Sequence, residues 1–112
     1  MLHPGDIVLV PFPFSEGKGH KWRPALVIST PVFHKKYGMC WAAMITSADN
    51  PPWPKDIAIS PLKNTGLTAP SVIRPAKIAS LQIDKARKIG KVAPEYLEET
   101  VEFIENQLPV TS

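Results

Sequence analysis

One arginine, preceded by a basic and aromatic cluster, carries the strongest chemical signal in the chain. Arg23 stands directly before Pro24, and a proline pushes the preceding residue into an extended conformation, so Arg23 is expected to project from the end of a strand. The residues just before it are basic or aromatic: Lys18, His20, Lys21 and Trp22. Cations that hold phosphates and rings that stack on bases are the means by which proteins grip single-stranded RNA. For Trp22, inside a polar loop, we favour a surface position over core packing.

Two hydroxyl residues end the apolar stretch "MCWAAMITS". Thr46 and Ser47 stand just before a polar loop, and a hydroxyl in such a place can donate to a phosphate oxygen. A lone hydroxyl is more often an ordinary strand-end residue. The signal gains weight only if the fold brings Thr46 beside Arg23.

Several other chemistries find no support. The three histidines, His3, His20 and His34, are scattered, and no Cys or His pair has metal-ligand spacing. No phosphate-cradling glycine motif and no Ser-His-Asp arrangement is evident, so we expect no metal and no cofactor. The single cysteine, Cys40, lies in an apolar stretch and is expected to be a buried, inert thiol.

The charge is distributed unevenly along the chain. The net charge is only +3, but all 13 Lys and Arg residues precede residue 92, and five of the ten acidic residues follow it. Residues 1–92 therefore carry 13 basic and five acidic residues, a net charge of +8, and the tail carries −5. A basic body suits a polyanion bound away from the acidic tail, and a solvated Lys-rich surface is the competing interpretation.

Short strands must position these residues. Alternating or continuous apolar patterns predict strands over residues 6–12, 24–30, 39–47, 56–60 and 71–83, with Pro75 implying an edge or a bend in the last. The pattern predicts a mobile loop over 15–22, a basic connection over 32–38 that turns at Gly38, and an irregular basic segment over 84–92.

The tail predicts a helix. Pro94 suits a first helical position, and Leu97, Val101, Ile104 and Leu108 form one apolar stripe that ends before Pro109. We expect that stripe to pack on the sheet. Short strands followed by one terminal helix indicate a mainly β fold, a small barrel or twisted sheet with a packed helix.

Length and composition indicate one domain over residues 1–112. No signal peptide is visible, and no apolar run approaches the roughly 20 residues that a membrane helix needs. We therefore expect a cytoplasmic protein with no membrane contact.

The ordered pieces "GDIVLVPFPF", "RPALVIS", "GMC", "ITS" and "GKVAPEYLEETVEFI" resemble the MazF/PemK family of toxin ribonucleases over nearly the whole chain. The resemblance implies an SH3-like β-barrel of the MazF/PemK/CcdB kind with a C-terminal helix, a homodimer, and a cognate antitoxin as partner. It also implies metal-independent cleavage of single-stranded mRNA by 2′-hydroxyl attack, which leaves a 2′,3′-cyclic phosphate and a 5′-hydroxyl.

The resemblance also implies residue roles. The Arg-Pro arginine of the family falls on Arg23, which would stabilise charge on the phosphate, and the strand-end threonine falls on Thr46, which would donate to that phosphate. Two positions depart from the family pattern: Lys18 replaces a glutamate, and Arg74-Pro75 replaces an acidic residue that is often followed by glutamine.

The departures leave the general base open. His20 has a suitable intrinsic pKa and is the candidate substitute, with an exposed loop histidine as the competing interpretation. RNA contacts are expected from the remaining basic, aromatic and hydroxyl residues: Lys18, Lys21, Trp22, Ser47, Arg74 and Lys77.

Two alternatives to a ribonuclease remain at this point. The same barrel could hold RNA or a partner without cleaving it, which the lost acidic positions favour. It could also poison a topoisomerase, an activity that occurs on a related fold.

Overall fold

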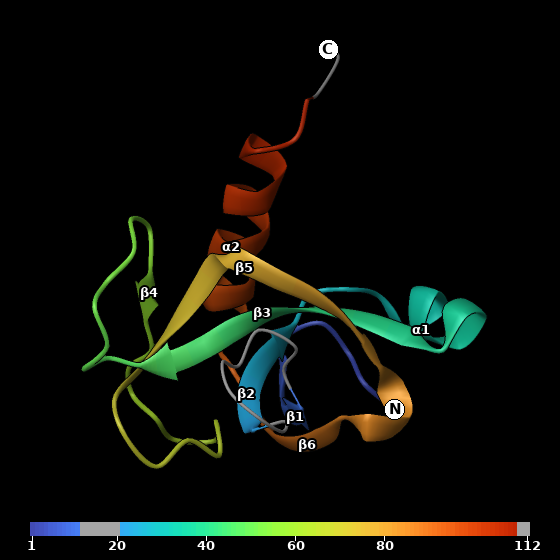
Figure 1. Ribbon diagram of the computed structural model, residues 1–112, viewed down its shortest axis with the longest axis horizontal. Helices are drawn as coiled ribbons and strands as arrows, with labels where there is room; N and C mark the ends of the chain where they lie inside the picture. Colours follow the sequence, from blue (N-terminus) through green and yellow to red (C-terminus); the bar gives the residue numbers. More distant parts are fainter. Residues whose placement is uncertain (12–20, 110–112) are drawn as a thin grey trace.

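Six antiparallel strands form one curled sheet in the computed structural model, which describes residues 1–11 and 21–109 (Figure 1). The strands are β1 (Asp6–Pro11), β2 (Trp22–Val27), β3 (Met39–Ser47), β4 (Ile57–Ala58), β5 (Ser71–Gln82) and β6 (Arg87–Lys91). Their order across the sheet is β4-β5-β3-β2-β1-β6. The expected mainly β fold with a C-terminal helix is confirmed, as a sheet curled into a half-barrel.

Each face of this sheet carries a buried apolar cluster of its own. Alternation along β1 sends Val8 and Val10 to one cluster and Ile7 to the other, and all three side chains are fully buried. The first cluster continues through β2, β3 and β5 with Ala25, Val27, Ala42, Met44, Ala79 and Leu81, and the second with Leu26, Ala43, Ile45 and Ile73. A curled sheet achieves this because its inner face closes on itself and its outer face is covered by other segments.

The longest pairing joins β3 to β5 and contains a bulge. Partners run from Met39 opposite Gln82 to Ser47 opposite Ser71, with a register shift where Ala43 pairs with Ile78 and Met44 with Arg74. Pro75 lies inside that shift, where its missing N–H costs no ladder bond. The predicted bend is therefore confirmed, within one continuous strand.

Two segments differ from the sequence-based prediction. Residues expected as a basic connection form a helix, α1 (Pro31–Tyr37), whose N-cap is Thr30 and whose C-cap is Gly38 at φ 67°. Part of the segment expected to be irregular forms a short 3₁₀ turn, η1 (Ile83–Lys85), and then β6, which pairs with β1. In both segments, runs of charged residues interrupt the apolar pattern from which a helix or strand would be predicted.

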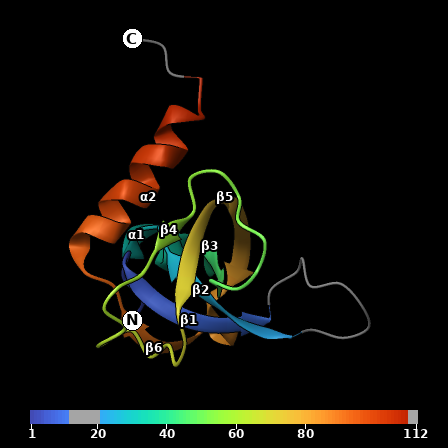
Figure 2. The ribbon, with the colours of Figure 1, turned by 90° about the vertical axis from the view of Figure 1, so that its left-hand side faces the viewer.

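The C-terminal helix, α2 (Pro94–Asn106), packs on the sheet less completely than predicted. Leu97, Val101 and Ile104 are half-buried and Leu108 is exposed, whereas Thr100 is fully buried. Figures 1 and 2 show that the helix starts against the sheet and then rises away from it, which leaves the stripe incompletely covered. No helix in the described part of the chain is long and apolar enough to cross a membrane.

Two glycines let the 61–70 loop cross β6 at backbone contact. A Cβ on Gly90 would lie 2.3 Å from the carbonyl carbon of Thr65, and one on Gly66 would meet the carbonyl of Ile89. The N–H of Lys91 donates to the Asn64 carbonyl across 2.9 Å. The crossing holds the loop, whose later residues reach the ends of β2 and β3.

Candidate active site

The register of the central strands sets Arg23 opposite Thr46. Ala25 pairs with Met44, and continuing this antiparallel register by two residues pairs position 23 with position 46. The ladder stops before that pair because Pro24 has no N–H to donate. Both side chains fall on the face of the sheet that carries Ala25 and Met44.

A pocket of about 240 Å³ lies where these strands end. Arg23 and Thr46 line it together, so the condition set by the sequence is met: the fold brings the hydroxyl and the guanidinium to one cavity. The rest of its lining comes from the two strand ends, the turn after β3 and the end of the 61–70 loop: Pro24, Ile45, Ser47, Asn50, Leu67, Thr68, Ala69, Pro70 and Ser71. None of these described lining residues is acidic or a histidine.

Arg23 carries a buried donor with no partner. Its Nε is shielded from solvent and makes no hydrogen bond among the residues that the structure describes. A buried N–H without an acceptor is costly in free energy. The side chain as a whole is half-buried, so the guanidinium is held by the protein at the pocket wall.

Thr46 has a partner that the sequence did not single out. Nδ2 of Asn50 donates to Oγ1 of Thr46 across 2.6 Å, and Thr46 is only 6 % exposed. Ser47 serves the same turn, because its Oγ accepts from the N–H of Asp49 across 3.1 Å. A polar residue four positions after the strand-end threonine was the one sequence signal for Asn50.

Arg74 does not have the surroundings of a phosphate contact. Its Nε and Nη2 donate to the two carboxylate oxygens of Asp56 across 3.0 and 2.8 Å, and Nη2 also donates to the carbonyl of Pro51. The guanidinium stacks 4.5 Å from the ring of Trp53, and its side chain is 8 % exposed. Arg74, which the sequence places among the RNA contacts, therefore ties the 51–56 loop to β5, and its contact with RNA stays a prediction.

The carboxyl of Asp56 responds to this environment. Hydrogen bonds from Arg74 hold the pKa of Asp56 below its ordinary value, with help from the backbone N–H of Trp53 and from the arginine's charge, and against an opposing effect of burial. The ion pair is therefore charged at neutral pH. The sequence offered no sign of it, because the two residues stand 18 positions apart.

The other residues predicted to contact RNA lie in different parts of the chain. Lys21 and Trp22 are exposed at the start of β2, beside Arg23, and Trp22 is 59 % exposed, as expected. Lys77 is half-buried, with its Nζ 5.9 Å from the ring centre of Trp53, on the bulged part of β5. Lys18 and His20 lie outside the described residues, as does most of the 15–22 segment.

The buried Ser29–His34 pair and Cys40 have structural roles. Oγ of Ser29 lies 2.7 Å from Nε2 of His34 and accepts from the N–H of Trp41, and both side chains of the Ser-His pair are buried. This pair links α1 to β3 and is closed to a substrate. Cys40 is buried, as predicted, and burial raises the pKa of its thiol to about 11, which favours low reactivity.

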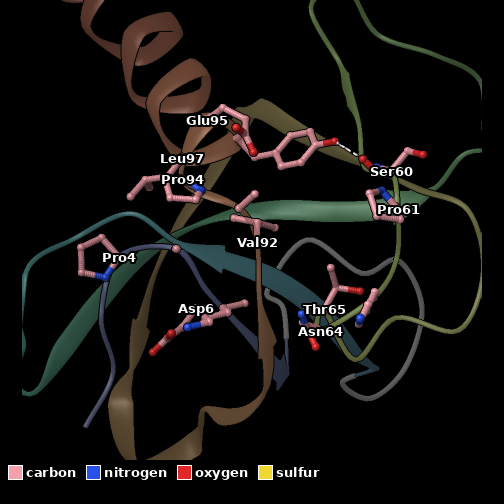
Figure 3. Close-up of a pocket in the computed structure, with 15 residues that line it drawn as sticks. Pro4, Asp6, Ser60, Pro61, Asn64, Thr65, Val92, Pro94, Glu95 and Leu97 are labelled. Carbon is pink, nitrogen blue, oxygen red and sulfur yellow. Dashed lines mark hydrogen bonds between the residues drawn. The ribbon is translucent and has the colours of Figure 1, made fainter.

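A larger cavity, about 500 Å³, lies elsewhere (Figure 3). It opens between the chain around Pro4, the 60–65 loop and the start of α2, where the Tyr96 hydroxyl donates to the carbonyl of Ser60 across 2.6 Å. Its lining includes neither Arg23 nor Thr46. It carries polar side chains of its own, among them Asp6, Lys63 and Glu95, but none of the site residues that the sequence predicted.

Comparison with known proteins decides the family. A family model described as "PemK-like, MazF-like toxin of type II toxin-antitoxin system" matches residues 3–108. The chain belongs to this family. A comparison with curated proteins gave no match.

Solved MazF structures share the fold of this MazF/PemK-family chain. MazF of Deinococcus radiodurans, alone, superposes with a TM-score of 0.76 at 21 % identity, covering 95 % of this chain and 94 % of that one. MazF in a MazE–MazF crystal of the same organism gives 0.79 at 21 % identity, covering 98 % of both chains. An endoribonuclease from a mycobacterial species, in complex with its cognate antitoxin, gives 0.69 at 18 % identity, covering 98 % and 97 %. At these identities the likeness shows the fold.

Proposed function

We propose that this chain is the toxin of a type II toxin–antitoxin pair and a sequence-specific endoribonuclease that cleaves single-stranded mRNA without a metal ion. The observation that carries the proposal is the pairing of Arg23 with Thr46 in one pocket of a MazF/PemK-family fold. A guanidinium with an unpartnered buried Nε, beside a hydroxyl, suits a phosphodiester.

In the proposed reaction, the ribose 2′-oxygen attacks the adjacent phosphorus and the bond to the 5′-oxygen breaks. The 2′-proton passes to a base, and the leaving oxygen takes up a proton, which gives a 2′,3′-cyclic phosphate and a 5′-hydroxyl. Arg23 binds the phosphoryl oxygens as their charge grows, and Thr46 donates to one of them. Each such donor is typically worth about 10²–10³ in rate.

The base must come from outside the described lining of this pocket. That lining has no carboxylate or imidazole, and Arg74 is paired with Asp56. We therefore keep His20 as the candidate base, since a histidine titrates near neutral pH. Lys18, Lys21 and Trp22 would hold the strand next to the cleaved bond, and Lys77 would extend that surface.

The proposed partners follow from the family and the charge distribution. The matched structures include a MazF with MazE and an endoribonuclease with its cognate antitoxin. A disordered, acidic antitoxin segment would be drawn to the +8 body of this chain. We also propose that the toxin acts as a homodimer in the cytoplasm, where its mRNA substrate is found.

One observation favours a second candidate, an RNA-binding module without catalysis. The described pocket offers phosphate-binding groups but no proton acceptor of ordinary carboxylate or imidazole type. Such a pocket could hold an RNA phosphate without cleaving it.

Cleavage of a long single-stranded RNA in EDTA separates these candidates. Wild type is compared with Arg23→Ala, and with Arg87→Ala as a control that removes the same charge from exposed β6. We expect discrete fragments with cyclic phosphate ends from wild type and Arg87→Ala, and a loss of at least about 10² in rate with Arg23→Ala. Binding without cuts would establish the module instead, and neither binding nor cuts would point to a protein target.

A further inference from the structure

The turn after β3 brings an amide against the hydroxyl of Thr46. Nδ2 of Asn50 donates to Oγ1 of Thr46 across 2.6 Å. A hydroxyl has one hydrogen and two lone pairs, so a donor on one lone pair turns the hydroxyl hydrogen away from that side. Within residues 1–11 and 21–109, no protein acceptor takes that hydrogen, and Thr46 lines the pocket that it shares with Arg23.

The backbone fixes Asn50 in this position. Its N–H donates to the carbonyl of Ser47 across 3.1 Å, and Oγ of Ser47 accepts from the N–H of Asp49 across 3.1 Å. The N–H of Ala48 donates to the carbonyl of Pro70 across 3.0 Å, which joins the turn to the opposite wall of the pocket. Asn50 is therefore held by a closed turn, although its side chain lies at the surface.

We propose that Asn50 is a positioning residue for the ribonuclease reaction. By donating to Oγ1 of Thr46, it leaves the hydroxyl hydrogen of Thr46 for a phosphoryl oxygen of the RNA. The inference rests on the proposed function, because it assigns Asn50 a part in that same reaction. Asn50 lines the same pocket, and in this role its effect on the reaction passes through Thr46.

The direction of this hydrogen bond matters because a hydroxyl rotates freely. Without Asn50, the hydroxyl of Thr46 must be oriented during the reaction, which forfeits part of the advantage of a preorganised donor. With a carboxylate at position 50, which only accepts, the hydroxyl must donate toward the turn and the phosphate loses its donor.

A double-mutant cycle tests this dependence. Single-turnover cleavage is measured for wild type, Asn50→Ala, Thr46→Val and the double variant, on a short RNA that contains a mapped cleavage site. We expect Thr46→Val to lose roughly 10²-fold in rate and Asn50→Ala about 10-fold, within the range that misplacing a group costs. Because Asn50 acts through Thr46, the double variant should be no slower than Thr46→Val alone.

A reversed hydrogen bond gives the second test. Asn50→Asp should be slower than Asn50→Ala, and adding Asp49→Asn, which restores the net charge of the turn, should not rescue it. Binding of the same RNA with a 2′-deoxyribose at the cleaved position should stay within about twofold of wild type for Asn50→Ala, since a positioning residue makes no contact with the RNA. Circular dichroism and urea unfolding check that each variant folds.

The outcomes separate the inference from the function on which it rests. Full additivity in the double variant, a wild-type rate for Asn50→Ala, or weakened RNA binding would overturn the positioning role while wild-type cleavage stands. Rescue of Asn50→Asp by Asp49→Asn would show a charge effect and would overturn it too. If the wild-type protein leaves RNA intact, both the proposed function and the positioning role of Asn50 are overturned. In that case Thr46→Val does not differ from wild type.

Discussion

Arg23 and Arg74 show how one side-chain type takes two roles according to its partners. Arg74 has its donors filled by Asp56 and Pro51, whereas Arg23 keeps a buried Nε without a partner in the described structure. Sequence reasoning selected Arg23 as a candidate because its neighbours along the chain are basic or aromatic. It did not foresee the ion pair of Arg74, because Asp56 is distant in the sequence and only the fold brings it near.

The Arg74–Asp56 pair should make the fold sensitive to acid. The pKa of Asp56 is lower in the folded protein, so the pair stabilises the fold fully above the ordinary carboxyl pKa of about 4. That contribution is lost as the pH falls through the lowered value. We expect the free energy of unfolding of Asp56→Asn to lie below that of wild type at pH 7, and the gap to narrow below about pH 4.

Urea unfolding at pH values from 7 to 2.5, spaced by about one pH unit, measures the difference in free energy of unfolding between wild type and Asp56→Asn. Asp49→Asn is the control, since Asp49 is exposed and lies outside the pair. A gap between wild type and Asp56→Asn that stays constant through the acid range would contradict the assignment of the lowered pKa to this pair.

Cys40 should resist thiol reagents while the protein is folded. Burial raises its pKa to about 11, so near pH 8 the thiolate fraction falls roughly 100-fold below that of a free cysteine. Reaction with a chromogenic disulfide should be very slow in buffer and complete quickly in urea. A fast reaction in the folded state would show that β3 opens readily at this position.

At the scale of elements, the sequence predicts those strands and helices that have a clear apolar pattern or a proline or glycine at their ends. The apolar run of β3 was predicted with its observed bounds, and Pro94 marked the first residue of α2. The ends of α1 were present as Thr30-Pro31 and Gly38, but were interpreted as a strand end and a turn. β6 escaped prediction because it alternates weakly and owes its existence to pairing with β1.

The crossing of the 61–70 loop over β6 should tolerate no side chain at position 90. In Gly90→Ala the new Cβ would meet the backbone of Thr65 at 2.3 Å, and backbone atoms cannot turn aside as a side chain can. We expect a loss of about 2–3 kcal/mol in the free energy of unfolding, and slower RNA cleavage because the loop also forms a pocket wall.

Gly38→Ala is the matched comparison in urea unfolding. Its Cβ would meet no atom within 4 Å, so only its positive φ of 67° is strained, at a cost of about 1–2 kcal/mol. It should leave the active-site pocket and the cleavage rate unchanged. Equal effects of the two substitutions on cleavage would contradict a role for the crossing in shaping the pocket.

At the scale of the whole molecule, charge and shape are segregated. The described basic residues belong to the sheet, its loops and α1, and the five glutamates of the tail lie in α2, which rises away from the sheet (Figure 2). The helix thus places its carboxylates away from the ends of β2 and β3, where the candidate active site lies. From this distribution of charge we expect a polyanion that approaches the site to be attracted by the basic body.

RNA binding should therefore depend on salt, and the dependence should identify the contacting cations. For single strands the slope of log K against log salt is about −0.7 per phosphate neutralised.

Lys21→Ala, beside Arg23, should weaken binding of a non-cleavable RNA and make the slope less steep by about 0.7. Lys91→Ala is the control, because Lys91 lies far from Arg23 along the sheet. In the strand register Lys91 is opposite Asp6, whereas Arg23 is opposite Val10, four residues further along β1. Binding measured by fluorescence anisotropy from 50 to 300 mM salt, roughly the range over which such slopes are resolved, distinguishes the two lysines. If both substitutions change the slope equally, the RNA follows the net charge of the body, and the path through the active-site pocket is wrong.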